Sequence, residues 1–180
     1  MVDRVILVGM MGAGKTTVGR LLAERLRWGH LDSDAQVMAS TGSSVPELFA
    51  ERGEEAFRAE ESRVLAEALS SPEPVVVSAA AGVVLSAANR DLLQRSGVVV
   101  WLRADPRVLT RRVGKGEGRP LLGDQPAARL ADLYEVRKPL YEALAEVTID
   151  VDGLPPDQVV DRLLAEPVLA DRGIGAGRGR

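Results

Sequence analysis

The residues best suited to chemistry stand near the N-terminus, where Gly9-Met10-Met11-Gly12-Ala13-Gly14-Lys15-Thr16 fits the pattern G-x-x-x-x-G-K-[ST]. Glycines let such a loop turn several backbone N–H groups inward, and a helix that begins at its end adds a positive dipole. Lys15 is then placed to reach the β- and γ-phosphates, and the Thr16 hydroxyl to ligate Mg²⁺. An ordinary glycine-rich turn is the alternative, but the apolar run before the motif and the helical pattern after it favour the phosphate loop. The nucleotide-binding residues predicted from this motif are Gly12, Ala13, Gly14, Lys15, Thr16 and Thr17.

Two carboxylates follow in the segment Asp32-Ser33-Asp34. On extended chain, side chains two residues apart can face the same crevice. One carboxylate could hold Mg²⁺ through water while the other accepts a proton from an attacking hydroxyl. The alternative is an Asx turn that caps a helix starting near Ala35.

Three arginines are candidates for binding anions. Arg58 lies on a long amphipathic pattern, Arg119 lies in a glycine-rich segment, and Arg137 precedes Lys138-Pro139-Leu140-Tyr141. A solvated helix face is the alternative for any one of them, since the chain is rich in arginine. A flexible loop that carries an arginine suits phosphoryl transfer, because closure excludes water and neutralises the transferring charge. The Arg137 guanidinium can pair with a substrate carboxylate through two hydrogen bonds.

Alternating apolar runs and helical patterns must position these side chains. We predict buried strands at Arg4–Val8, Gly29–Asp32, Pro74–Val77, Gly97–Leu102 and Val147–Val151. We predict helices at Thr16–Leu26, Glu54–Leu69, Asn89–Arg95, Pro106–Val113, Ala127–Ala145 and Pro156–Leu164, and a capping box at Ser44–Glu47 marks a further helix start. This alternation indicates an α/β fold with a parallel sheet covered on both faces, in which ligands bind beyond the carboxyl ends of the strands.

The composition narrows the chemistry further. The 180 residues carry a net charge of −3, contain no Cys and one His, and are 3% aromatic. Disulfide scaffolds and metal sites built from several Cys or His ligands are therefore excluded. We see no membrane span and no signal peptide, and we expect a cytoplasmic protein. Three arginines near the C-terminus contribute too little charge to predict nucleic-acid binding.

In combination, the motifs resemble the shikimate kinase family. The chain has in order the phosphate loop, Asp32-Ser33-Asp34, Phe57-Arg58, a turn after the third strand, Arg119-Pro120-Leu121-Leu122 and Arg137-Lys138-Pro139-Leu140-Tyr141. The resemblance runs from about Val5 to Leu164. It implies a three-layer P-loop NTPase fold, with a five-stranded parallel sheet of order 2-3-1-4-5 flanked by helices and a mobile lid.

The resemblance also implies an activity and roles for single residues. The activity is ATP-dependent phosphorylation of the 3-hydroxyl of shikimate, in the chorismate pathway to aromatic amino acids. Asp34 would hold the reacting hydroxyl and act as the base, and Arg58 and Arg137 would clamp the carboxylate. Lys15 and Arg119 would serve catalysis at the phosphates, Thr16 and Asp32 would bind Mg²⁺, and Arg112 would lie against the adenine.

The chain departs from the family in the turn after the third strand. The family has three consecutive glycines there, whereas this chain has Ala80-Ala81-Gly82, which we align as substrate-binding residues. An alanine costs about 1 kcal/mol or more wherever a positive φ is required. Three interpretations remain open: a normal shikimate kinase, a kinase for a related polyol or cyclitol, and a nucleotide-binding paralogue or variant with weakened catalysis.

We expect one domain over residues 1–168, with a substrate-binding region at about 33–61 and a lid at about 113–125. Residues 169–180 are rich in Gly and Arg and are expected to form a disordered tail. The expected partners are ATP and shikimate, without nucleic acid or membrane, and we expect a monomer.

Overall fold

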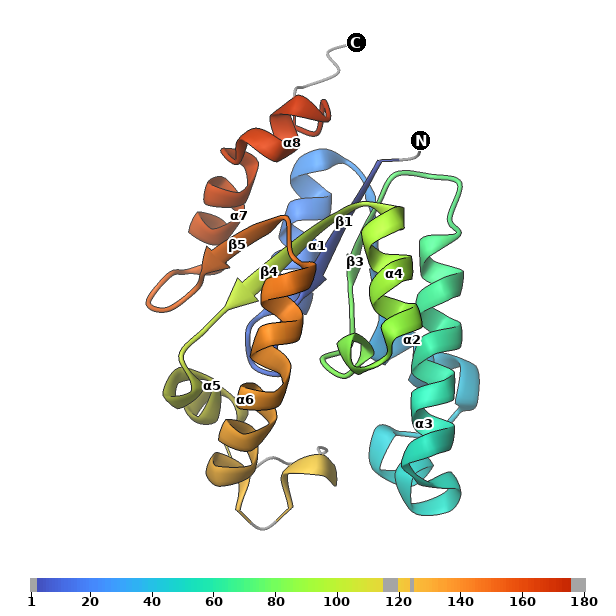
Figure 1. The fold of residues 1–180 in the computed structure, drawn as a ribbon. Helices are drawn as coiled ribbons and strands as arrows, with labels where there is room; N and C mark the ends of the chain where they lie inside the picture. Colours follow the sequence, from blue (N-terminus) through green and yellow to red (C-terminus); the bar gives the residue numbers. More distant parts are fainter. Residues whose placement is uncertain (1–2, 115–119, 124, 176–180) are drawn as a thin grey trace.

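The computed structural model describes residues 3–114, 120–123 and 125–175. In this part of the chain a five-stranded parallel sheet has the order β2-β3-β1-β4-β5 (Figure 1). The strands are β1 (Arg4–Val8), β2 (Gly29–Asp32), β3 (Val75–Ser78), β4 (Val98–Arg103) and β5 (Val147–Asp150). The predicted fold and strand order are thereby confirmed.

Helices cover both faces of the sheet. They are α1 (Lys15–Leu26), α2 (Ser33–Thr41), α3 (Val45–Leu69), α4 (Ala87–Ser96), α5 (Pro106–Val113), α6 (Pro126–Leu144), α7 (Pro156–Leu164) and α8 (Pro167–Asp171), with short 3₁₀ helices η1 (Val83–Leu85) and η2 (Pro120–Leu122). Helix α1 packs on β1, β2 and β3 and against α7, whereas α4 and α6 pack on β4, with α3 beside α4 (Figure 1). This three-layer arrangement explains why β1, β3 and β4 are almost completely buried. The edge strands β2 and β5 were also predicted to be buried, but both are partly exposed.

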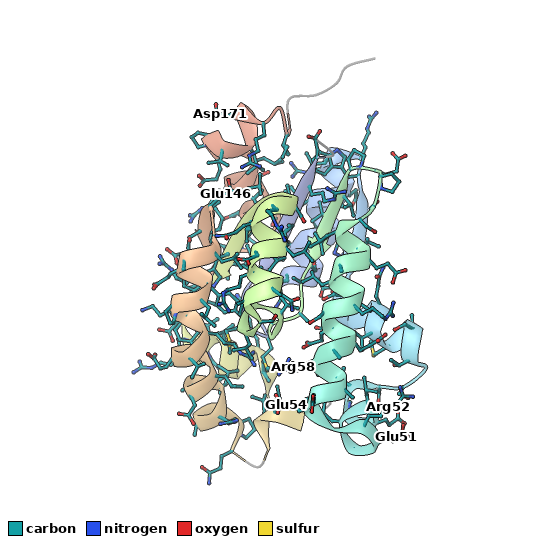
Figure 2. The ribbon with its side chains drawn as sticks, turned by 45° about the vertical axis from the view of Figure 1, so that its right-hand side comes forward. Glu51, Arg52, Glu54, Arg58, Glu146 and Asp171 are labelled. Atoms are coloured by element: carbon teal, nitrogen blue, oxygen red, sulfur yellow. The ribbon has the colours of Figure 1, made fainter. Side chains whose placement is uncertain are left out.

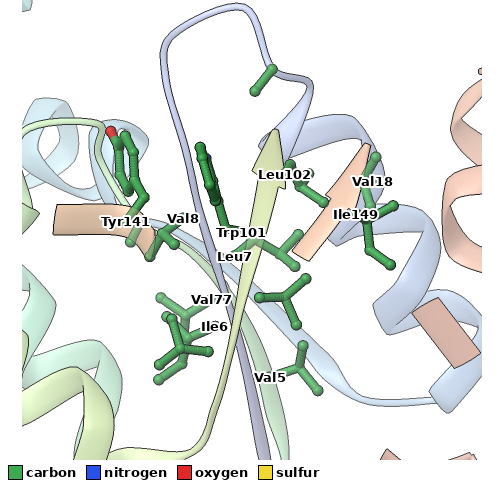
Figure 3. Close-up of a cluster of buried hydrophobic side chains, with 14 of the residues drawn as sticks. Val5, Ile6, Leu7, Val8, Val18, Val77, Trp101, Leu102, Tyr141 and Ile149 are labelled. Carbon is green, nitrogen blue, oxygen red and sulfur yellow. The ribbon is translucent and has the colours of Figure 1, made fainter. Parts of the chain in front are cut away.

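The core is built from the strands and the helix faces turned toward them. Val5, Ile6 and Leu7 of β1 are fully buried, and Trp101 of β4 stacks on Tyr141 of α6 with 5.7 Å between ring centroids (Figure 3). Since β1 is the central strand, the phosphate loop that follows it starts from a rigid position.

Helix α3 begins with the predicted capping box and is interrupted at Gly53. The Ser44 side chain accepts from the Glu47 backbone N–H, and the Glu47 side chain accepts from the Ser44 backbone N–H. Gly53 has φ 79° and ψ 174°, so the helix breaks there into a short first part and a long second part. A smaller apolar cluster of Val37, Leu48, Phe57 and Val64 joins α2 to both parts of α3.

The structure extends the predicted elements at two places. Helix α2 follows β2 directly and begins at Ser33, two residues before the start near Ala35 that the capping alternative gave. Helix α8 occupies the start of the segment expected to be a disordered tail, and Leu169 and Ile174 are buried in the main core. The tail therefore cannot begin at residue 169, because apolar side chains anchor the chain up to Ile174; residues 176–180 lie outside the described part. No helix within the described ranges is both long enough and apolar enough to cross a membrane.

Candidate active site

The phosphate loop leaves β1 and runs into the first turn of α1. Gly12 and Gly14 have φ of 83° and 92°, a left-handed conformation that glycine adopts without strain, and Gly14 is the N-cap of α1. The Lys15 ammonium group donates to the backbone carbonyls of Gly9 (2.9 Å) and Met10 (3.1 Å). The loop therefore presents a helix N-terminus and a lysine to the same place, which suits it to hold phosphates.

Thr16 and Asp32 come together from different elements. The Thr16 hydroxyl donates to the Asp32 carboxylate at 2.5 Å. The other carboxylate oxygen of Asp32 accepts from the backbone N–H groups of Asp34 and Ala35, which caps α2. The geometry of Asp32 is therefore compatible with both interpretations. Its carboxylate caps helix α2, and it also lies next to the Thr16 hydroxyl that is predicted to bind the metal. A hydroxyl and a carboxylate oxygen beside a phosphate loop fit a hard cation such as Mg²⁺.

A cavity of about 360 Å³ opens on one side of the phosphate loop. We call it the acceptor cavity, and its lining combines charged side chains with an apolar wall. The charged members are Asp34, Arg58, Glu61 and Arg137, and Met11, Met38, Val45, Pro46, Phe49, Phe57 and Leu121 line the apolar part, together with Ser44, Ala81 and Gly82. The predicted substrate residues Asp34, Arg58 and Arg137, far apart in the sequence, thus line one cavity.

Arg58 is held by two carboxylates on its own helix. Its guanidinium donates to Glu61 at 2.5 Å and to Glu54 at 3.2 Å, and Figure 2 shows Arg58 and Glu54 on the same part of α3. Glu61 is only 3% exposed. Burial raises the pKa of Glu61, and the adjacent Arg58 charge opposes that increase. These contacts fix the direction in which Arg58 meets the cavity.

Arg137 on α6 is almost completely enclosed, with 1% of its surface exposed. Its Nε atom is buried and has no hydrogen-bond partner among the described residues. Burial lowers the pKa of Arg137, and the nearby Arg58 charge lowers it further. A buried guanidinium with an unused donor at the edge of a cavity is suited to bind an anionic group, such as a carboxylate, that enters the cavity.

The turn after β3 adopts its conformation without strain at either alanine. Arg27 is the one non-glycine residue with positive φ in the described ranges, so Ala80 and Ala81 both have negative φ. Ala80 is buried in the core, is not among the residues that line the acceptor cavity, and donates its backbone N–H to the Ser33 hydroxyl at 2.7 Å. Ala81 does line the cavity, and its carbonyl accepts from the Tyr141 hydroxyl at 2.8 Å.

Gly82 is the position in this turn where a side chain would not fit. A Cβ atom built on Gly82 would lie 1.9 Å from Nη1 of Arg58. The guanidinium therefore rests directly on the Gly82 backbone, and the one glycine of the turn that this chain keeps is the one that Arg58 requires.

A second cavity, of about 300 Å³, lies on the other side of the phosphate loop. It is lined by Gly12, Ala13, Gly14, Thr17 and Val18, by Arg112 of α5, and by Val151, Leu154, Pro156 and Val159. Arg112 donates to the carbonyls of Gly12 (3.3 Å) and Val151 (3.4 Å), which joins the loop to the segment after β5. Because Met11 lines the acceptor cavity and Gly12 lines this one, the phosphate loop forms a wall shared by both.

The predicted lid lies mostly outside the described residues, and three residues around the site were not identified from the sequence. Arg119 and the rest of 115–119, together with residue 124, lie outside the described residues, so the predicted lid is represented by its flanks, of which Leu121 lines the acceptor cavity. Sequence reasoning missed Glu61, Ser33 and Tyr141. The spacing Arg58–Glu61 was a possible signal for Glu61, since residues three apart on a helix are neighbours.

Comparisons with known proteins agree with this geometry. A model of the family described as shikimate kinase matches residues 11–167. A shikimate kinase of Ruegeria pomeroyi is 47% identical over 163 residues, which cover 89% of this chain and 83% of that protein. A shikimate kinase of Thiobacillus denitrificans is 45% identical over 149 residues, or 82% of this chain and 81% of the relative.

Among solved structures, a shikimate kinase superposes more closely on this chain than a gluconokinase does. Shikimate kinase from Acinetobacter baumannii in complex with shikimate superposes with a TM-score of 0.89 at 36% identity, over 95% of both chains. A gluconokinase from Sinorhizobium meliloti reaches a TM-score of 0.56 at 25% identity, over 91% of this chain and 90% of that chain. The family match covers most of the chain and the relatives exceed 40% identity; the chain belongs to the shikimate kinase family.

Proposed function

We propose that this protein transfers the γ-phosphoryl group of ATP to the 3-hydroxyl of shikimate. The observation that carries the proposal is the position of the phosphate loop between two cavities, one of which contains Arg58, Arg137 and Asp34. Family membership supports the same acceptor, because a relative of similar fold was solved in complex with shikimate.

In this proposal the acceptor is held at two ends. Arg137 and Arg58 bind its carboxylate, and Glu61 holds the Arg58 guanidinium in place. Asp34, in the first turn of α2, receives the hydroxyls at the other end. As the new O–P bond forms, Asp34 takes the proton of the attacking hydroxyl while the bond between the γ-phosphorus and the bridging oxygen breaks, which leaves ADP.

The donor side is assigned to the phosphate loop and its neighbours. The loop amides and Lys15 bind the phosphates, while Arg112 and the segment after β5 receive the adenine side of the nucleotide. Thr16 and Asp32 would hold Mg²⁺, which would supply positive charge to neutralise the phosphates. Arg119 completes the phosphate environment in this proposal. Positioning and electrostatic stabilisation then supply most of the catalysis.

A coupled assay of ADP release tests the proposal. Purified protein is supplied with ATP and Mg²⁺ and then with shikimate, gluconate or a nucleoside monophosphate in separate reactions. We expect ADP release that depends on shikimate and saturates with its concentration. Release that depends on gluconate or a nucleoside monophosphate and not on shikimate would overturn the assignment of the acceptor, and binding of ATP without turnover would favour a nucleotide-binding paralogue.

A further inference from the structure

Tyr141 is a buried polar group to which the mechanism above gives no role. It lies on α6, is fully buried, and packs its ring against Trp101 (Figure 3). Its hydroxyl donates to the carbonyl of Ala81 at 2.8 Å and lies 3.9 Å from the sulfur of Met10. Because the ring is enclosed on all sides, the hydroxyl can act only on the atoms that it touches.

One of those atoms, the Ala81 carbonyl oxygen, belongs to a residue in the wall of the acceptor cavity. Ala81 and Gly82 line the cavity, and the Arg58 guanidinium rests against Gly82. Arg137 precedes Tyr141 by four residues on α6, so both side chains are on one face of that helix. Burial raises the pKa of Tyr141, and the Arg137 charge opposes that increase, which indicates that the guanidinium is close to the hydroxyl.

The turn is held from a second side by Ser33, which accepts the backbone N–H of Ala80 at 2.7 Å. Ser33 is fully buried and precedes Asp34. The two hydroxyls therefore join the turn to the helix that carries Asp34 and to the helix that carries Arg137. Neither bond depends on glycine, which explains how Ala80 and Ala81 are accommodated.

We propose that the Tyr141 hydroxyl is a positioning group for the phosphoryl acceptor, because it fixes the Ala81 carbonyl and with it the Ala81–Gly82 wall on which Arg58 rests. The inference rests on the proposed function, since it assigns Tyr141 to the acceptor side of the reaction. Without the hydroxyl the Ala81 carbonyl loses this hydrogen bond. The Ala81 peptide can then turn toward the cavity that it lines, and the wall no longer matches the acceptor.

The test is Tyr141→Phe, which removes one oxygen atom and keeps the ring. Initial rates are measured with shikimate varied at saturating ATP, and with ATP varied at saturating shikimate. We expect the KM for shikimate to rise about five- to tenfold, as for loss of a net hydrogen bond, while the KM for ATP stays within about twofold. An unchanged KM for shikimate, or an equal rise in both KM values, would overturn the inference.

Tyr134→Phe is the matched control. Tyr134 is also on α6 and nearly buried, but among the described residues its hydroxyl makes no hydrogen bond to the turn after β3, whereas that of Tyr141 does. Thermal unfolding of both variants separates a loss of stability from a loss of positioning, and we expect Tyr134→Phe to leave both KM values unchanged. If Tyr141→Phe does not fold, Ser33→Ala removes the other hydrogen bond to the turn, and the same difference between the two KM values is expected.

The two proposals fail in different ways. A wild-type protein without shikimate-dependent ADP release contradicts the proposed function and this inference with it. An active wild type whose Tyr141→Phe variant behaves like Tyr134→Phe contradicts the inference alone.

Discussion

Two arginines and two carboxylates line the acceptor cavity, and they differ in whether another side chain of the protein already pairs with them. Glu61 is paired with Arg58, whereas the Nε of Arg137 is buried without a partner in the described part of the chain. Sequence reasoning identified Arg58, Arg137 and Asp34, because each lies in a motif. Glu61 was missed because one more glutamate on an amphipathic helix resembles a solvated residue, whereas in the folded chain it is only 3% exposed.

The first prediction concerns Gly82, in the turn after β3. Gly82→Ala places a Cβ atom on the Arg58 guanidinium and forces it to move. We expect kcat/KM for shikimate to fall about tenfold to a hundredfold, as for loss of a charge-assisted hydrogen bond. The control is the double variant Ala80→Gly with Ala81→Gly, which we expect within about threefold of wild type because no strain is relieved. A marked gain of activity in that control would show that the alanines do impair the turn.

Glu61 gives a prediction on pH. Burial raises the pKa of Glu61 above its usual value of about 4.5, so the folded state binds this proton more tightly than the unfolded chain does. As pH rises through the window from about 4.5 to the raised pKa, the free energy of unfolding therefore falls relative to that of Glu61→Gln. Urea unfolding of both proteins at a series of pH values measures the difference. Across this window the free energy of unfolding of Glu61→Gln is expected to increase relative to that of wild type. A difference between the two proteins that does not change with pH would contradict the effect of burial on the pKa of Glu61.

At the scale of elements, the break in α3 decides how the acceptor cavity is walled. The short part before Gly53 carries Val45, Pro46 and Phe49, and the long part after it carries Arg58 and Glu61. A continuous helix would point the two parts along one axis. The positive φ at Gly53 lets both parts face the same cavity.

Gly53→Ala tests this break. Alanine at φ 79° and ψ 174° is strained, so we expect a loss of about 1–3 kcal/mol in the free energy of unfolding and a higher KM for shikimate. Ala59→Gly, at an exposed site in the same helix, is the control for helix propensity and is expected to cost about 1 kcal/mol with no change in KM. Equal effects of the two variants on KM would mean that the break does not position the cavity wall.

The sequence was most informative about the elements that are buried on both faces. All five strands were predicted to within one residue at each end. The continuous apolar runs of β1, β3 and β4 have few other structural solutions, whereas β2 and β5 are partly exposed edge strands with weaker patterns. Helix α2 was predicted only in the alternative in which Asp32 caps a helix starting near Ala35, because the same carboxylate was also interpreted as a metal ligand. Helix α8 was missed because two or three apolar residues in a Gly- and Arg-rich segment show no periodicity; their burial depends on the main core.

In the molecule as a whole, the two cavities lie on either side of the phosphate loop. The C-terminal segment contributes Leu169 and Ile174 to the main hydrophobic core. Leu169 of α8 is fully buried, whereas the adjacent Val168 is only partly buried. The segment after α7 is therefore part of the folded domain at least as far as Ile174.

Leu169→Ala measures that contribution. We expect a loss of about 2–3 kcal/mol in the free energy of unfolding, from lost apolar burial and the cavity that remains. Val168→Ala is the matched control and is expected to cost about 1 kcal/mol. Similar small losses in urea unfolding for both variants would show that α8 adds little to the core.

Shikimate in the acceptor cavity, with Asp34 taking the proton of its hydroxyl, is the proposal on which the other assignments depend. It is tested by ADP release from ATP and Mg²⁺ as a function of shikimate concentration, for wild type and Asp34→Asn side by side. We expect saturable, shikimate-dependent release by the wild type and a rate at least about a hundredfold lower for the variant. No shikimate-dependent release by the wild type, or equal rates for the two proteins, would contradict it.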